Sequence, residues 1–195
     1  VALDWAERVG LRLHDVLAYG RMGVPGAYVG RYRQDWEPVL WFSRPGGEVF
    51  FDKEPLAEDA ASGPYQKAAG SRRADGVVST RDTSGWAAAE GKRQRGTLWW
   101  YGNVGHGHVD AELEATGHPA RFALAFAKDA VRAHCPPGGL VCDPFVGSGT
   151  SALAAAVSGC SFVGGDLLDR EDGVSWAEVA RRVAGPVSDF GEMFF

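Results

Sequence analysis

The sequence lacks any apolar run long enough to cross a bilayer. Spanning needs roughly 18 to 20 consecutive apolar residues, and no stretch of this 195-residue chain reaches that length. The first residues, from Val1 to Trp5, have neither the basic region nor the apolar core of a signal peptide. Cysteine is also scarce, since Cys135, Cys142 and Cys160 are odd in number and lie in apolar surroundings. They are typical of small core residues rather than of a disulfide framework. We therefore predict a globular cytoplasmic protein without a membrane segment.

Positive charge is scarce overall but unevenly distributed. The formal net charge is −5, which argues against a general polyanion binder. Between Gln66 and His108, however, seven basic residues stand against three acidic ones, a local charge of +4. Such a block can contact phosphate groups.

No metal site or activated nucleophile can be recognised in the sequence. His106 and His108 lack a second pair of Cys or His residues at ligand spacing. No Ser/His/Asp or Cys/His grouping stands in a known nucleophile context. We therefore predict no metal ligand in this chain.

The most informative stretch is a strand followed by a glycine turn and a helix. Residues 140–142 form a short apolar run, as in a buried parallel strand. The turn Gly147-Ser148-Gly149 follows, and residues 151–156 are small, strong helix formers. This order is half of a nucleotide-binding unit, because glycines let the backbone approach a ligand and a helix N-terminus presents free N–H groups. About 20 residues further on, such units place an acid on the ribose; here a predicted strand over 162–166 ends at Asp166.

Two longer motifs are more specific than the glycine pair. Residues 143–150 read Asp-Pro-Phe-Val-Gly-Ser-Gly-Thr, and residues 118–122 read His-Pro-Ala-Arg-Phe. Together they resemble the β class of DNA amino-methyltransferases, which methylate adenine N6 or cytosine N4 with S-adenosylmethionine. The resemblance is close from His118 to Asp166 and looser elsewhere, and Ala123 stands where the family usually has a second proline.

The resemblance implies a fold and a cofactor site. The fold is α/β: a partial Rossmann-like sheet of the S-adenosylmethionine-dependent methyltransferases, with an irregular target-recognition region inserted. The implied cofactor-binding residues lie in both motifs and at the end of the following strand, and His118 is placed near the methionine end of the cofactor. They are His118, Pro119, Phe122, Asp143, Pro144, Phe145, Gly147, Ser148, Gly149, Thr150 and Asp166.

The resemblance also divides the chain into three parts. Residues 1–47 would supply edge strands of the sheet as a hairpin, although an ordinary β-hairpin has the same pattern. Residues 48–117 would form the target-recognition insertion on double-stranded DNA, and residues 118–195 the cofactor-binding part. Basic residues interleaved with aromatic ones suit phosphate contacts and base stacking, so the predicted DNA contacts are Arg72, Arg73, Lys92, Arg93 and Arg95. A solvated loop with one short strand on the core is the alternative for this region.

One motif of the family is missing. The resemblance implies a catalytic tetrapeptide (Asp/Asn/Ser)-Pro-Pro-(Tyr/Phe/Trp), which binds the target amino group and stacks on a base taken out of the duplex. The only Pro-Pro, at 136–137, follows Cys135 and precedes Gly138. We therefore predict no catalytic residue here and no methyl transfer unless an N-terminal segment or a second chain supplies the motif. The strands expected with that segment would be missing too, leaving open strand edges on both sides of a gap.

Two other function classes compete with this interpretation. A nucleotide-dependent oxidoreductase would need a third glycine at the helix start, where Ala152 stands. A catalytically silent DNA-binding or regulatory subunit that keeps the methyltransferase fold remains open, because the tetrapeptide is absent. The sequence does not decide between adenine and cytosine.

Overall fold

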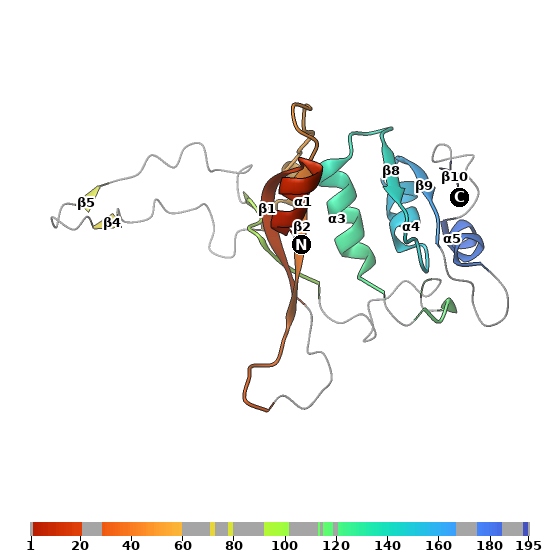
Figure 1. Cartoon of the computed structure of the whole chain (residues 1–195), viewed down its shortest axis with the longest axis horizontal. Coiled ribbons are helices and arrows are strands. Elements are labelled where there is room, and N and C mark those ends of the chain that lie inside the picture. The colour runs from red at the N-terminus through yellow and green to blue at the C-terminus, as the bar shows by residue number, and fades with distance from the viewer. Residues whose placement is uncertain are drawn as a thin grey trace. The chain divides into compact units, whose positions relative to one another are not determined.

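The computed structural model describes residues 2–20, 29–59, 71–72, 78–79, 92–101, 113, 115–118, 121–166, 175–184 and 193–194. The chain forms two compact units (Figure 1). The main unit comprises Val1–Phe51 and Thr97–Phe195, and the inserted unit comprises Asp52–Gly96. Among the helices in these described ranges, none is long and apolar enough to cross a membrane.

The first sheet of the main unit is built around strand β1 (Arg12–Gly20). Helix α1 (Ala2–Val9) precedes it. Strand β2 (Trp36–Ser43) pairs with β1 antiparallel, from Arg12 opposite Ser43 to Gly20 opposite Trp36. Strand β7 (Leu98–Trp100) pairs with the other edge of β1 in parallel. The structure thus confirms the hairpin predicted within residues 1–47.

The second sheet carries the glycine turn. Strands β8 (Leu140–Asp143) and β9 (Ser161–Gly164) run parallel, with helix α4 (Thr150–Val157) between them in the chain. Strand β10 (Met193–Phe194) adds a third parallel strand beside β9. No strand is predicted there from the sequence, because two residues are too few to give a periodic strand pattern. Helix α5 (Trp176–Ala184) packs on α4.

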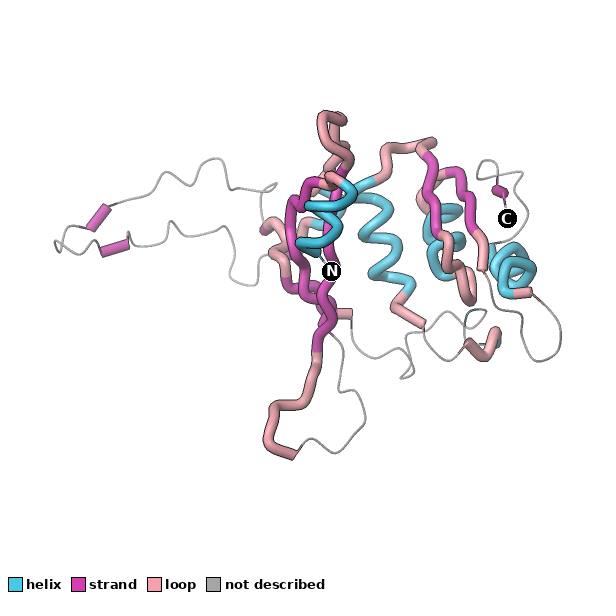
Figure 2. Tube along the Cα trace, viewed as in Figure 1, coloured by secondary structure: helices cyan, strands magenta, loops and turns pink. Residues whose placement is uncertain are grey.

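Helix α3 (Leu124–His134) lies between the two sheets of the main unit (Figure 2). It packs on α4 through a core of small and medium side chains, among them Ala127, Val131 and Ala155. Phe162 of β9 is fully buried in this core. On the other side, the rings of Phe126 and Tyr19 lie 4.8 Å apart, and those of His134 and Trp41 lie 4.6 Å apart. The helix therefore joins two sheets that do not pair with each other in the described part of the chain.

One face of β8 is exposed. Leu140 is 61% exposed and Cys142 is also exposed, whereas Cys160 is buried. The prediction that the cysteines are core residues is therefore confirmed for Cys160 and wrong for Cys142. The reason lies in the strand's alternation, because Leu140 and Cys142 point to the same side of β8 and no described element covers that side.

The inserted unit contains short elements. They are a 3-10 turn at Glu54–Leu56 and the strands β3 (Glu58–Asp59), β4 (Ser71–Arg72), β5 (Val78–Ser79) and β6 (Lys92–Arg93). Strand β3 pairs with β6, and β4 pairs with β5, both antiparallel.

Candidate functional site

The glycine turn is closed by hydrogen bonds to Asp143, the last residue of β8. Its Oδ1 accepts from the backbone N–H of Phe145 at 2.9 Å, and its Oδ2 accepts from the Ser151 hydroxyl at 2.5 Å. The N–H of Gly149 donates to the carbonyl of Val146 at 2.9 Å. One carboxylate therefore binds both the start of the turn and the first turn of α4, which fixes where the helix begins.

The two glycines of the turn have different structural roles. Gly149 has φ +90°, and a Cβ built on it would lie 2.7 Å from the Cα of Ala180 in α5. Gly147 has φ +49°, and a Cβ there would lie 3.0 Å from Nε2 of His118. Both glycines are needed for a left-handed backbone. In addition, Gly149 lets α5 pack closely, and Gly147 lets the imidazole of His118 lie on the turn.

The structure brings the two motifs together at Gly147. A Cβ built on Gly147 would lie 3.0 Å from Nε2 of the His118 ring, and the Gly147 N–H donates to Oδ2 of Asp166 at 2.9 Å. Two backbone bonds connect the same segments, from Val146 N–H to the Gly165 carbonyl at 2.9 Å and from Gly165 N–H to the Asp143 carbonyl at 3.1 Å. A carboxylate can accept about four hydrogen bonds, so the bond to Gly147 is compatible with further bonds from ribose hydroxyls.

The remaining predicted cofactor residues differ in exposure. Phe145 is 75% exposed and Phe122 is 38% exposed, so both can present a ring face to a ligand. Pro144 is exposed as well. Ser148 and Thr150 are buried, and their hydroxyls lie 3.2 Å apart. They stabilise the start of α4 from within. Pro119 lies outside the described residues.

Tyr19 is a positioning residue that the sequence analysis missed. The N–H of Ala123 donates to the Tyr19 hydroxyl at 3.2 Å, across 104 residues of sequence. Ala123 has φ −65° and ψ 134°, and a φ near −65° is the value that proline imposes. Alanine at this family proline position therefore keeps the backbone conformation and adds a donor that proline lacks. No local pattern marks Tyr19, because its partner is distant in sequence.

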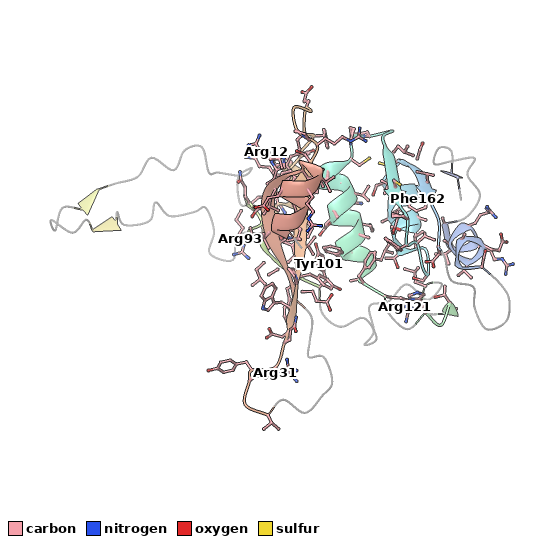
Figure 3. The ribbon with its side chains drawn as sticks, viewed as in Figure 1. Arg12, Arg31, Arg93, Tyr101, Arg121 and Phe162 are labelled. Carbon is pink, nitrogen blue, oxygen red and sulfur yellow. The ribbon has the colours of Figure 1, made fainter. Side chains whose placement is uncertain are left out.

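A second tyrosine and an arginine belong to the same region (Figure 3). Tyr101, directly after β7, donates its hydroxyl to Asp129 of α3 at 2.7 Å. Arg121 lies between His118 and α3, and its Nη1 is buried without a hydrogen-bond partner in the described part of the chain. The bond between Tyr19 and Ala123 thus holds the end of the segment that carries His118 and Phe122, and Nη1 of Arg121 in this segment has no hydrogen-bond partner among the described residues.

The predicted DNA contacts of the inserted unit are engaged with nearby acids. Arg93 and Arg95 form ion pairs with Glu58 at 2.8 and 2.9 Å, and Lys92 pairs with Asp59. Burial raises the pKa of Glu58, but hydrogen bonds from Arg95 and Arg93 outweigh it and hold that pKa below its usual value. The hydrogen bond from Lys92 lowers the pKa of Asp59. Arg72 belongs to β4 and Arg73 lies outside the described residues, so the DNA role of this set stays a prediction.

The sequence is similar to a DNA methylase family and to two curated methyltransferases. The chain matches the DNA methylase family over residues 3–171. It is 29% identical over 136 residues to the type II methyltransferase M.ScaI of Streptomyces caespitosus, covering 70% of this chain and 40% of that protein. It is 25% identical over 163 residues to the orphan methyltransferase M.BamHII of Bacillus amyloliquefaciens, covering 83% of this chain and 60% of that protein. The chain thus spans only part of the curated relatives it matches.

Comparison with solved structures concerns the fold. A complex of M1.HpyAVI with SAM has a TM-score of 0.57 at 21% identity, over 92% of this chain and 66% of that one. The cytosine-N4-specific PvuII DNA methyltransferase has a TM-score of 0.56 at 16% identity, over 100% of this chain and 64% of that one. These likenesses confirm the predicted Rossmann-like α/β methyltransferase fold.

Proposed function

Because the chain belongs to the DNA methylase family, we propose that it is the cofactor-binding and target-recognition part of a DNA amino-methyltransferase. Such an enzyme transfers a methyl group from S-adenosylmethionine to the exocyclic amino group of adenine or cytosine in double-stranded DNA. The observation that carries the proposal is the junction at Gly147, where the ring of His118 and the carboxylate of Asp166 meet the glycine turn. Three segments distant in sequence converge there, each carrying a residue that the family resemblance assigns to the cofactor.

The residues at this junction fit the chemistry of the cofactor. Asp166 offers a carboxylate for ribose hydroxyls, which are hydrogen-bond donors. Phe145 and Phe122 offer partly exposed rings for stacking or apolar contact. His118 lies on the turn, at the end assigned to the methionine part of the cofactor. When bound, S-adenosylmethionine supplies an electrophilic methyl group on a sulfonium ion; these residues bind and orient it.

We further propose that a segment carrying the catalytic tetrapeptide completes the sheet. Among the described strands, β8 pairs only with β9, and β2 pairs only with β1, so each has an open edge in the same unit. The uncovered face of β8, with Leu140 and Cys142, also lacks an apolar layer. Strands added beside β8 would satisfy the open edge and bring the tetrapeptide close to the glycine turn. The segment can belong to the same polypeptide or to a second chain.

Methyl transfer tests the proposal directly. Tritium transfer from labelled S-adenosylmethionine to duplex DNA would be measured for residues 1–195 alone and together with a segment that bears the tetrapeptide. We expect transfer only in the second case, and nucleoside analysis would then identify N6-methyladenine or N4-methylcytosine. Transfer by residues 1–195 alone would show that another residue replaces the motif. DNA binding without transfer in both cases would instead support the silent DNA-binding subunit.

A further inference from the structure

Phe126, in the first turn of α3, is the centre of an aromatic cluster. Its ring centroid lies 4.8 Å from that of Tyr19, 5.8 Å from those of Tyr101 and Phe122, and 5.9 Å from that of Trp99. The rings of Trp99, Tyr101 and Phe122 meet it at steep angles of 67°, 78° and 85°. Such edge-to-face pairs are a preferred arrangement of aromatic rings. One half-buried side chain therefore packs against rings from three other parts of the chain.

Three of these rings belong to the first sheet or follow it directly. Tyr19 and Trp99 are in register on the adjacent strands β1 and β7, and residues in register share a face of the sheet. Both are buried, with exposed fractions of 5% and 3%. Tyr101, two residues after Trp99, lies between β1 and α3 in Figure 3. The first sheet thus fixes Phe126 close to the point where the chain returns from the inserted unit, which ends at Gly96.

The fourth ring, that of Phe122, is the exposed member of the cluster. Its side chain is 38% exposed, and the proposed function assigns this ring to the cofactor. The backbone beside it is held by the bond from the Ala123 N–H to the Tyr19 hydroxyl at 3.2 Å. The ring itself lies edge-on against Phe126, which in turn packs on Tyr19. The backbone and the ring of this segment are therefore held by the same part of the first sheet.

We propose that Phe126 is a positioning residue for the cofactor, because it holds the ring of Phe122 in the orientation that contacts S-adenosylmethionine. The inference rests on the proposed function, and it adds a residue that lies outside both sequence motifs. A ring that is already held in the free protein loses little rotational freedom when the ligand binds. Loss of that freedom otherwise weakens binding roughly 2- to 13-fold for each side chain that becomes ordered.

The test is a double-mutant cycle on cofactor affinity. Calorimetry with S-adenosylmethionine would compare the natural full-length polypeptide with its Phe126→Leu, Phe122→Leu and doubly substituted variants. Leucine keeps an apolar side chain but removes the ring, so Phe126→Leu should weaken binding roughly 2- to 13-fold. Because Phe126 acts through Phe122, the double variant should bind no more weakly than Phe122→Leu alone.

A matched control separates positioning from a loss of fold stability. Val131 is a buried residue of the same helix that packs into the core shared with α4. Val131→Ala should lower the unfolding free energy, measured by urea denaturation, but leave the affinity for S-adenosylmethionine unchanged. With the tetrapeptide segment present, methyl transfer gives a second measurement. Phe126→Leu should raise the KM for S-adenosylmethionine with kcat unchanged, because the lost interaction contributes equally to the ground state and the transition state.

The outcomes separate this inference from the proposed function. Non-additive losses in the cycle, with unchanged affinity in Val131→Ala, support the positioning role. Unchanged affinity in either single phenylalanine variant overturns it while the proposed function stands. Strictly additive losses also overturn it, as does a loss in Val131→Ala as large as that in Phe126→Leu. No binding of S-adenosylmethionine by the wild type would contradict the proposed function itself.

Discussion

The two motif segments of the site are held in place by different means. The glycine turn is fixed locally, through Asp143, which bonds Phe145 and Ser151, and through glycines with positive φ. The segment from His118 to Ala123 is fixed at its end from a distance, by the hydroxyl of Tyr19 on the first sheet. The first arrangement depends on residues within one short stretch, whereas the second depends on how two sheets pack on α3. The proposed cofactor site therefore combines a local motif with a tertiary contact.

The largest effect is expected on the unfolding free energy of a variant in the glycine turn, where a matched control separates backbone strain from overpacking. Gly149→Ala places a Cβ in a left-handed conformation and against the backbone of α5. Gly138→Ala is the matched control, since Gly138 has φ +73° with no atom within 4 Å of its built Cβ. We expect the control to lose about 1–2 kcal/mol of unfolding free energy from strain, and Gly149→Ala to lose a further ~1–3 kcal/mol from overpacking. Urea denaturation would measure both.

Equal losses in the two glycine variants would contradict the close approach of α5. The same geometry corrects one interpretation of this turn. A side chain at Gly149 meets α5 before it can meet a ligand, so loss of cofactor binding in a Gly149→Val variant would report packing rather than blocked backbone approach.

A smaller effect is expected for the distant contact between Tyr19 and Ala123. Tyr19→Phe removes one hydrogen bond, which contributes about 0.5–1.5 kcal/mol. Ala123→Pro keeps φ near −65° but removes the donor and leaves the Tyr19 hydroxyl without it. In the double variant neither the donor nor the acceptor of this hydrogen bond remains, so the losses of unfolding free energy in the two single variants should not add. The rigidity of proline should raise the unfolding free energy by about 0.4–1 kcal/mol. A thermal double-mutant cycle would measure the coupling, and strictly additive losses would contradict this account of Ala123.

The difference between the two segments also explains what the sequence could predict. Residues 140–166 obey local rules of strand, glycine turn and helix, so β8, α4 and β9 were predictable, although β9 ends at Gly164 and not at Asp166 as predicted. The bond between Tyr19 and Ala123 was not, because it spans 104 residues. The net charge of +4 counted for the basic block left out nearby acids for a related reason. The counted window began after Glu58 and Asp59, which form ion pairs with Lys92, Arg93 and Arg95 across strands β3 and β6.

The exposure of β8 shows a further limit of sequence patterns. An apolar strand such as Leu140 to Cys142 predicts burial on both faces, but Leu140 and Cys142 are exposed. The pattern is consistent with a strand that is covered once neighbouring strands and helices are present. Burial depends on which other segments pack against the strand, and these do not appear in the local sequence.

If the junction at Gly147 is a site for S-adenosylmethionine, Asp166 should contribute to the affinity, which calorimetry of Asp166 variants would measure. A charged hydrogen bond contributes about 1.5–3 kcal/mol, so Asp166→Ala should weaken binding roughly 10- to 150-fold. Asp129→Asn is the control, because it alters another hydrogen-bonded carboxylate of the main unit that lies outside the turn. With an analogue that lacks the ribose hydroxyls, the effect of Asp166→Ala should largely disappear. Unchanged affinity for S-adenosylmethionine in Asp166→Ala, or an equal loss for both ligands, would contradict the site.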